Sequence, residues 1–285
     1  MKTKTKIRLA SIASCVIVFF RRLSGRGHKS VMNRGGIRWD LDLHEGIDFA
    51  IYLLGLFERS TVKTYKRLLS SGDTVLDIGA NMGAHTLPLA QAVGPPGKVI
   101  AFEPTAYAYR KLIRNISLNP GLEPRIRAEQ IMLSDSDEQL SCPSLYSSWG
   151  LNSIETSRHP KHLGQLMATD GATCVKLDDY VAESGLSRID FIKIDVDGNE
   201  CSVLRGALQT LKTHRPKILM EFMPYGLNEH GSTLEELVEL LKSTDYGIFG
   251  IPDLSSLPEN PDQIGRLISD GSSINVLCLP RNSSA

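Results

Sequence analysis

The chain has 285 residues, 41% hydrophobic and 22% charged, which is enough for one core of about 200 residues with extensions. Lysine plus arginine and aspartate plus glutamate each total 32, so net charge excludes a partner held by bulk electrostatics, such as nucleic acid or an acidic polymer. The five cysteines are odd in number and form no C-x-x-C pair, which argues against a zinc site or disulfide framework and favours the cytoplasm.

The first 36 residues form a basic and apolar extension. Nine lysines and arginines, and no acidic residue, occur in the first 34 positions, around the apolar run LASIASCVIVFF at 9–20. This run is short for a bilayer span, which needs about 20 residues, and no small-residue cleavage site follows it. Three interpretations stay open: a buried or surface-packed helix, a weak membrane-surface anchor that anionic lipid would favour, and an uncleaved signal anchor.

Residues 37–71 are predicted to pack on the core as a strand and two helices. IRWDLDL (37–43) alternates like a half-buried strand, and 45–57 has helical apolar spacing. A second helix is predicted at 58–69, with Ser60 or Thr61 as its N-cap.

A repeating order of strand and helix runs from residue 72 to 280 and forms the predicted main domain. The predicted strands are 74–79, 99–104, 125–135, 189–198 and 217–222. The predicted helices that alternate with them are 85–93, 107–119, 176–185, 200–214 and 233–243. An irregular stretch covers 136–172, and the last two strands, 246–251 and 273–280, have no clear helix between them. This order indicates a mostly parallel sheet with helices on both faces and a terminal antiparallel hairpin.

The stretch TVLDIGANMGAHT (74–86) ends a predicted strand with a carboxylate and a glycine-rich turn. Ligands in open α/β sheets bind beside such strand ends. A dinucleotide needs a small residue where Asn81 stands and would be repelled by Asp77, so a nicotinamide dehydrogenase is disfavoured. S-adenosylmethionine carries no phosphate; Asp77 suits its cationic part directly or through water, and Gly79 and Gly83 let the backbone turn against the nucleoside.

Two further strand ends supply polar groups for the same nucleoside. Glu103 stands twenty positions after Gly83 and can accept both ribose hydroxyls. Ser134 or Asp135 could border adenine. The alternative is that the carboxylates only cap helices or face solvent and the glycines only make turns. The predicted cofactor-binding residues are Asp77, Gly79, Ala80, Asn81, Gly83, Glu103, Pro104, Ser134 and Asp135.

Five segments in order carry a resemblance to a known family: DTVLDIGANMGAHT, VIAFEPTAYAYRKLIRNISLN, the LSD strand end, DFIKIDVDGNECSVLRGA and ILMEF. They are similar to the FkbM family of S-adenosylmethionine-dependent methyltransferases, from about Ile37 to Leu279. The resemblance implies the class I methyltransferase fold, which is Rossmann-like with a seven-stranded sheet. It also implies O-methylation of hydroxyls on sugars, glycolipids or secondary metabolites. Family members usually have Glu where Asp197 stands. Asp197 keeps the negative charge, but its side chain is shorter by one methylene group.

The fourth and fifth strand ends carry the candidates for catalysis. Methyl transfer to a hydroxyl is an in-line displacement in which the acceptor loses a proton, so a base or a metal helps. We expect Asp195 to be the acceptor's hydrogen-bond partner or base, Glu221 on the adjacent strand to position the substrate, and Asp197 to be the next candidate. Clustered carboxylates also suit Mg²⁺, but the ligands stay unassigned, because Asp197 and Glu200 could instead cap the following helix.

Other polar residues near these segments have open roles. Lys193 is predicted to pair with a carboxylate of a neighbouring element, and His85 either touches the cofactor or is a satisfied neighbour. The insertion at 141–164 either overhangs the active site or forms a surface hairpin, and its aromatic and histidine residues are Tyr146, Trp149, His159 and His162.

The sequence therefore predicts an S-adenosylmethionine-dependent O-methyltransferase that acts on a small-molecule or glycan hydroxyl. One alternative is a non-catalytic binding protein with this fold, against which the intact acidic strand ends argue. Another is a nucleic-acid methyltransferase, against which the zero net charge and the lack of a basic stripe on the core argue. The acceptor, oligomeric state and membrane contact stay open.

Overall fold

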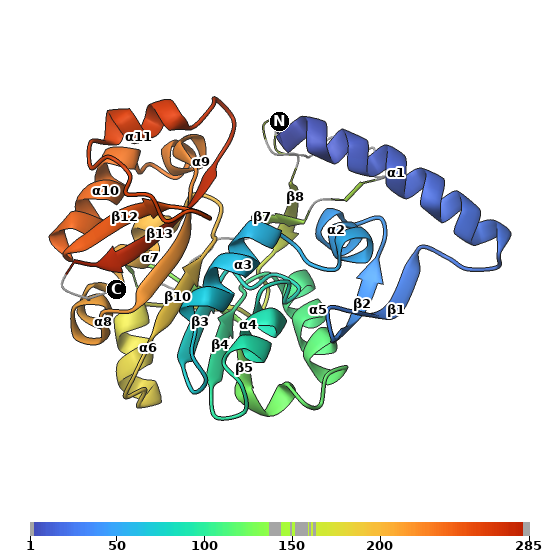
Figure 1. Cartoon of the computed structure of the whole chain (residues 1–285), viewed down its shortest axis with the longest axis horizontal. Coiled ribbons are helices and arrows are strands. Elements are labelled where there is room, and N and C mark those ends of the chain that lie inside the picture. Colours follow the sequence, from blue (N-terminus) through green and yellow to red (C-terminus); the bar gives the residue numbers. More distant parts are fainter. Residues whose placement is uncertain are drawn as a thin grey trace.

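The computed structural model describes residues 3–136, 144–148, 150–151, 159, 161 and 164–281. Seven strands form its central sheet: β3 (Thr74–Ile78), β4 (Lys98–Phe102), β5 (Ile126–Glu129), β10 (Phe191–Ile194), β11 (Lys217–Phe222), β12 (Tyr246–Gly250) and β13 (Ile274–Pro280). Their order is β12–β13–β11–β10–β3–β4–β5, and every pair is parallel except the two that β13 makes (Figure 1). This confirms the predicted class I methyltransferase architecture, including its antiparallel last pair.

Helices pack on both faces of this sheet. Alternate strand residues point to opposite faces, so Leu76 and Ile78 lie in one core with α6, α7, α8 and α10, whereas Val75 lies in a second core with α3 and α4. The helices are α1 (Thr3–Leu23), α2 (Gly46–Leu54), α3 (Arg59–Leu68), α4 (Thr86–Ala92), α5 (Ala106–Ser117), the short 3₁₀ helix η1 (Glu123–Arg125), α6 (Leu177–Ser184), α7 (Glu200–Arg205), α8 (Leu208–His214), α9 (Pro224–Glu229), α10 (Leu234–Ser243) and α11 (Pro261–Leu267).

In the part of the chain that the structure describes, three two-stranded sheets lie outside the central one. They are the antiparallel hairpin of β1 (Lys29–Arg34) and β2 (Ile37–Asp42), the parallel pair of β6 (Ile131–Leu133) and β9 (Thr173–Val175), and the antiparallel pair of β7 (Ser144–Ser148) and β8 (Gln165–Ala168). No strand was predicted for β1, whose side chains alternate between exposed and partly buried without any full burial. The β1–β2 hairpin crosses the predicted boundary at residues 36 and 37.

Two predicted elements are wrong as single units. The strand predicted at 125–135 divides at Gln130 into β5, at the edge of the central sheet, and β6, which pairs with β9. The helix predicted at 200–214 breaks after Arg205 into α7 and α8. Asp178 binds both sides of the break, because its N–H donates to the carbonyl oxygen of Gly206 and its carboxylate accepts the N–H groups of Gln209 and Thr210. Gly206 is required there, since a Cβ would lie 2.1 Å from the carbonyl oxygen of Ser134. Contacts between distant segments cause this break, and local periodicity does not encode them.

The start of α3 and the connection between β12 and β13 also differ from the prediction. Glu58 is the N-cap of α3, so neither Ser60 nor Thr61 caps it. α11 occupies the connection between β12 and β13, where no helix was predicted, and the side chain of Asn260 caps it by accepting the backbone N–H of Gln263. The Asn-Pro pair at its start is a known helix-start signal that the prediction overlooked.

α1 extends the apolar run 9–20 in both directions and packs on the fold by one side. Val18 is buried in a small core with Leu43, Phe49 and Leu151. The hydroxyl of Ser14 donates to the carbonyl oxygen of Leu43 at 2.5 Å. This side of α1 fits the surface-packed interpretation. Within the described ranges, no helix has both the length and the apolar character that crossing a membrane requires.

Candidate active site

The glycine-rich turn after β3 is held between β4 and β10. The backbone N–H groups of Gly79 and Ala80 donate to the carbonyl oxygen of Phe102 at 3.0 and 2.9 Å. Gly79 has φ +81°, and a Cβ there would lie 1.8 Å from the carbonyl oxygen of Asp195. Only glycine fits here, because the end of β10 fills the space of a side chain. Asn81 also has a positive φ, +49°, which asparagine adopts more readily than most residues.

Glu103, at the end of β4, closes over the same turn. Its Oε2 accepts the N–H of Asn81 at 2.8 Å, and its Oε1 accepts the N–H and hydroxyl of Thr105 at 2.8 and 2.5 Å. Burial raises the pKa of Glu103 despite these hydrogen bonds. A carboxylate offers about four lone-pair sites, and the hydrogen bonds from the described residues leave one of them, on Oε2, open. Gly83, with φ +94°, completes the turn, and Pro104 directly follows Glu103.

A buried ion cluster lies beneath the turn. Asp77 and Lys193 are register partners in the parallel pair of β3 and β10, so their side chains share one face. Lys193 Nζ lies 3.7 Å from Asp77 Oδ1 and 3.1 Å from Asp195 Oδ2. Burial lowers the pKa of Lys193, but the charges of Asp195 and Asp77 outweigh it and raise that pKa. The predicted pairing of Lys193 is confirmed. Asp77 itself is fully buried, and its Oδ2 accepts the hydroxyl of Thr86 at 2.6 Å.

Polar residues of α3 and its cap extend this cluster, and the sequence analysis missed them. His85 Nε2 lies 3.6 Å from Glu58 Oε2, and the rings of His85 and Tyr65 are 6.0 Å apart. Burial raises the pKa of Glu58, but its contact with His85 and the charge of Lys193 bring that pKa to about 2. Glu58 reaches the cluster because it has φ +43° before α3, and a side-chain position set by such a turn leaves no periodic signal.

Carboxylates gather at the ends of the neighbouring strands β10 and β11. Burial, followed by the charges of Asp195 and Glu200, raises the pKa of Asp197 well above its usual range. Burial and the charges of Asp195 and Asp197 do the same for Glu221. The hydroxyl of Ser273 donates to Glu221 Oε1. The structure thus brings the predicted catalytic residues together, and their roles stay predictions.

Glu200 is the first residue of α7, whose N-cap is Asn199, and its side chain binds the turn that precedes the helix. Its Oε1 accepts the N–H groups of Val196 and Gly198, both at 3.3 Å. The residue is fully buried, and burial is the largest cause that raises its pKa to about 7. Its second carboxylate oxygen has no hydrogen-bond partner among the described residues.

The side chains of Ser134 and Asp135 face α7. Ser134 Oγ lies 3.0 Å from Ser202 Oγ, and Asp135 accepts hydrogen bonds from Ser202 at 2.8 Å and Arg205 at 2.5 Å. Burial raises the pKa of Asp135, but the hydrogen bonds from Arg205 and Ser202 outweigh it and lower that pKa. Their predicted place beside adenine stays a prediction.

The described part of the insertion lies across this edge of the sheet. The carbonyl oxygen of Ser147 on β7 accepts Nδ2 of Asn81 at 2.8 Å. His159 Nε2 lies 2.8 Å from Glu229 Oε2 on α9. These contacts favour an insertion that overhangs the site over a free surface hairpin. Two residues named in the sequence analysis, Trp149 and His162, lie outside the described residues.

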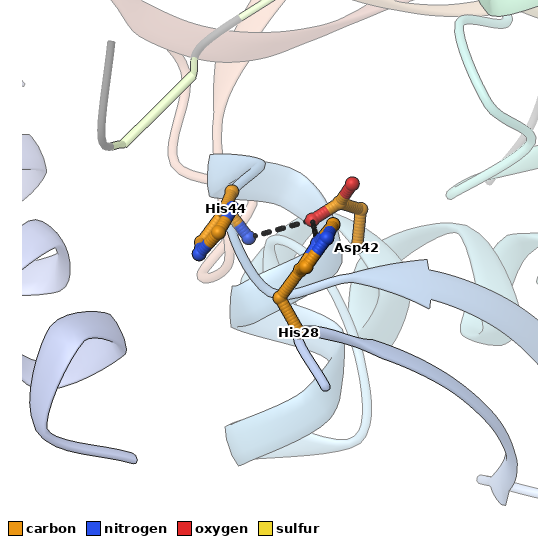
Figure 2. A group of neighbouring side chains, drawn as sticks. All are labelled: His28, Asp42 and His44. Carbon is orange, nitrogen blue, oxygen red and sulfur yellow. Dashed lines mark hydrogen bonds and ion pairs between the residues drawn. The ribbon is translucent and has the colours of Figure 1, made fainter. Parts of the chain in front are cut away.

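One group of possible metal ligands occurs among the described residues, at the base of the β1–β2 hairpin. Figure 2 shows His28, Asp42 and His44, whose nearest ligand atoms lie within 4.8 Å of one another. His28 Nδ1 is 2.8 Å from Asp42 Oδ1, and the two imidazole rings stack 4.3 Å apart at 4° from parallel. An imidazole nitrogen binds a metal through a lone pair in the ring plane, so stacked rings cannot aim both lone pairs at one ion. We interpret the group as a hydrogen-bonded stack.

Sequence comparison identifies relatives of this chain. The family profile described as methyltransferase FkbM domain matches residues 77–248, more than half of the chain, including the glycine-rich turn after β3 and the ends of β10 and β11. The 2-O-methyltransferase NoeI of Sinorhizobium fredii is 30% identical over 199 residues, which are 65% of this chain and 79% of that protein. The 31-O-demethyl-FK506 methyltransferase FkbM of Streptomyces tacrolimicus is 29% identical over 210 residues, 65% and 76% of the two chains. The hexuronic acid methyltransferase AglP of Haloferax volcanii is 26% identical over 159 residues, 55% and 59% of the two chains.

Proposed function

This chain belongs to the FkbM family of S-adenosylmethionine-dependent methyltransferases, and we propose that it methylates a hydroxyl group of a sugar, glycolipid or secondary metabolite. Two relatives have names that specify O-methylation, NoeI and FkbM, and AglP is named for a hexuronic acid. The observation that carries the proposal is the group of carboxylates at the ends of β10 and β11 beside the turn at Gly79.

The turn and the β4 end fit the proposed cofactor. S-adenosylmethionine supplies an activated methyl group on a sulfonium. Asp77, Asp195 and Glu58 outnumber the ammonium of Lys193, and such an excess of negative charge suits a cationic ligand. The free lone pair on Glu103 Oε2 suits a ribose hydroxyl. Asp77 has no exposed surface, so its proposed role is to hold the turn in place. The full proposed set is Asp77, Gly79, Ala80, Asn81, Gly83, Glu103, Pro104, Ser134 and Asp135.

Asp195 is the proposed partner or base for the acceptor hydroxyl. Its side chain is 33% exposed, while that of Lys193, 3.1 Å away, is 3% exposed. The buried ammonium donates to the carboxylate and orients it. The carboxylate can then accept the proton that the hydroxyl loses as its oxygen takes the methyl group. Glu221, held by Ser273, is proposed to position the acceptor, with Asp197 as the next candidate.

A methyl-transfer assay tests this proposal. The protein is incubated with methyl-labelled S-adenosylmethionine and a panel of free sugars, lipid-linked sugars and hydroxylated metabolites, and each labelled product is treated with mild alkali. A methyl ether survives this treatment, whereas a methyl ester is hydrolysed. A label that alkali releases contradicts transfer to a hydroxyl. Binding of S-adenosylhomocysteine without transfer to any acceptor favours the non-catalytic alternative.

Substitution of Asp195 tests the proposed base once an acceptor is found. We expect Asp195→Asn to lower kcat by about 10²- to 10⁴-fold and to leave the Kd for S-adenosylhomocysteine within about twofold. Glu239→Gln, at an exposed carboxylate on α10, is the matched control and should change neither value. If Asp195→Asn retains the wild-type kcat, Asp195 is not the base.

A further inference from the structure

α1 carries its larger apolar side chains on the side that faces away from the fold. Six of them are between 50 and 70% exposed, and they make up half of the large, exposed apolar side chains in the described ranges. They recur every three or four residues, with one adjacent pair, so they form one stripe along the helix. We call this the apolar stripe, and it consists of Leu9, Ile12, Val16, Phe19, Phe20 and Leu23.

The opposite side of α1 packs on the fold through Val18, which is buried, and through Ala10, Ala13 and Ile17. The hydroxyls of Ser11 and Ser14 donate to the carbonyl oxygens of Leu151 and Leu43 at 2.7 and 2.5 Å. A helix on the surface of a water-soluble domain normally turns its larger apolar residues inward. α1 turns Ile17 and Val18 inward but leaves the six residues of the apolar stripe outside, so the apolar stripe does not serve packing within the chain. A continuous exposed patch of this kind marks an interaction surface.

The distribution of charged residues along the chain indicates which kind of partner fits the apolar stripe. The nine lysines and arginines of the first 34 residues have no acidic residue among them, and the rest of the chain has 23 basic against 32 acidic residues. The net positive charge is therefore confined to the segment that contains α1. A second copy docked on the same stripe would bring two basic segments together and be repelled. An anionic lipid surface offers both the opposite charge and an apolar layer.

We propose that α1 docks this enzyme onto an anionic bilayer, lying in the plane of the membrane interface. The apolar stripe enters the boundary between headgroups and acyl chains, and the exposed Arg8 and Arg22 contact the headgroups. Because none of the described helices is long and apolar enough to span a bilayer, the attachment is peripheral. Ser11 and Ser14 keep α1 bound to the fold while its outer side meets the lipid.

Vesicle co-sedimentation of the full chain tests this proposal. We expect the protein to bind vesicles of phosphatidylcholine with phosphatidylglycerol, to bind phosphatidylcholine alone more weakly, and to be released by salt. Burial of one large apolar side chain corresponds to about tenfold in affinity, so Ile12→Asp and Phe19→Asp should each lower binding by about that factor. Ile113→Asp, at a 44% exposed position on α5, is the matched control and should bind like the wild type. Arg22→Glu should weaken binding only to the anionic vesicles.

Two results would overturn the proposal. The first is wild-type protein that stays in the supernatant with anionic vesicles while its circular dichroism and S-adenosylhomocysteine binding show a folded protein. The second is equal vesicle binding by Ile12→Asp and Ile113→Asp. Light scattering identifies the competing occupant: a dimer that Ile12→Asp disperses, without vesicle binding, assigns the apolar stripe to a second copy.

Discussion

At the scale of single residues, Gly79 is the position with least freedom. Its φ of +81° disfavours any side chain, and a Cβ would meet the carbonyl oxygen of Asp195 at 1.8 Å. We predict that Gly79→Ala lowers the free energy of unfolding by more than about 2 kcal/mol, as measured by urea denaturation. Gly121→Ala is the control, since nothing lies within 4 Å of an added Cβ there. Equal stability of the two variants would show that β10 can yield at this turn.

Glu200 links folding stability to pH. Its pKa rises from 4.5 to about 7 on folding, so the folded state keeps a proton that the unfolded state releases. Its stabilising contribution is therefore complete below pH 4.5 and is lost as the pH rises toward 7. Glu200→Gln keeps the Oε1 acceptor and cannot ionise. Relative to the wild type, the free energy of unfolding of Glu200→Gln should rise by up to about 3 kcal/mol as the pH goes from 4.5 to about 7.

Urea denaturation at the two pH values measures this difference. Glu239→Gln, at an exposed carboxylate, is the control and should follow the wild type. The prediction fails if Glu200→Gln and the wild type depend on pH in the same way.

At the scale of elements, one contact joins two distant parts of the main domain. The strand end after β6 and the break between α7 and α8 meet where the carbonyl oxygen of Ser134 approaches Gly206. Next to this contact, Arg205 on α7 donates both to Asp135 and to Glu236 on α10. The end of β6, the break between α7 and α8 and the ion pairs of Arg205 thus lie in direct contact with one another.

These contacts predict how substitution of Asp135 changes stability and cofactor binding. Asp135→Asn should lower the free energy of unfolding by about 1 kcal/mol, because the charge-assisted bond from Arg205 is partly exposed. It should raise the Kd for S-adenosylhomocysteine less than Glu103→Gln does, because the Asp135 side chain faces α7. Calorimetry on both variants gives the comparison. A larger rise for Asp135→Asn would mean that its side chain reaches the adenine.

At the scale of the whole molecule, ligand binding should stabilise the entire sheet. The turn after β3 contacts β4 and β10, whose residues lie in both main cores. We predict that S-adenosylhomocysteine at about 100 times its Kd adds about 2.7 kcal/mol of stability, seen as a rise in Tm, and that NAD adds none. Glu103→Gln should show a smaller rise. A well-folded protein that neither ligand stabilises would contradict the proposed cofactor site.

The sequence by itself determined the sheet and the edge at which the site lies. Alternating strands and helices predict a parallel sheet, and the carboxyl ends of parallel strands meet at one edge. Asp77, Glu103, Asp195 and Glu221 could therefore be assigned to a common edge before their contacts were known. The glycines at 79 and 83 were also readable, because a close backbone turn demands that residue type.

Only the tertiary structure decided which of these groups touch and which side of each helix is covered. The contact of Lys193 with Asp77 depends on strand register, and the place of Glu58 depends on one positive φ before α3. The outward direction of the apolar stripe follows from contacts of the other side of α1, where Val18 packs against Leu43 and Ser14 donates to its carbonyl oxygen, 29 residues away. The spacing of apolar residues in the sequence predicts which of them share one face of a helix. Contacts with segments far away in the sequence decide which face is covered.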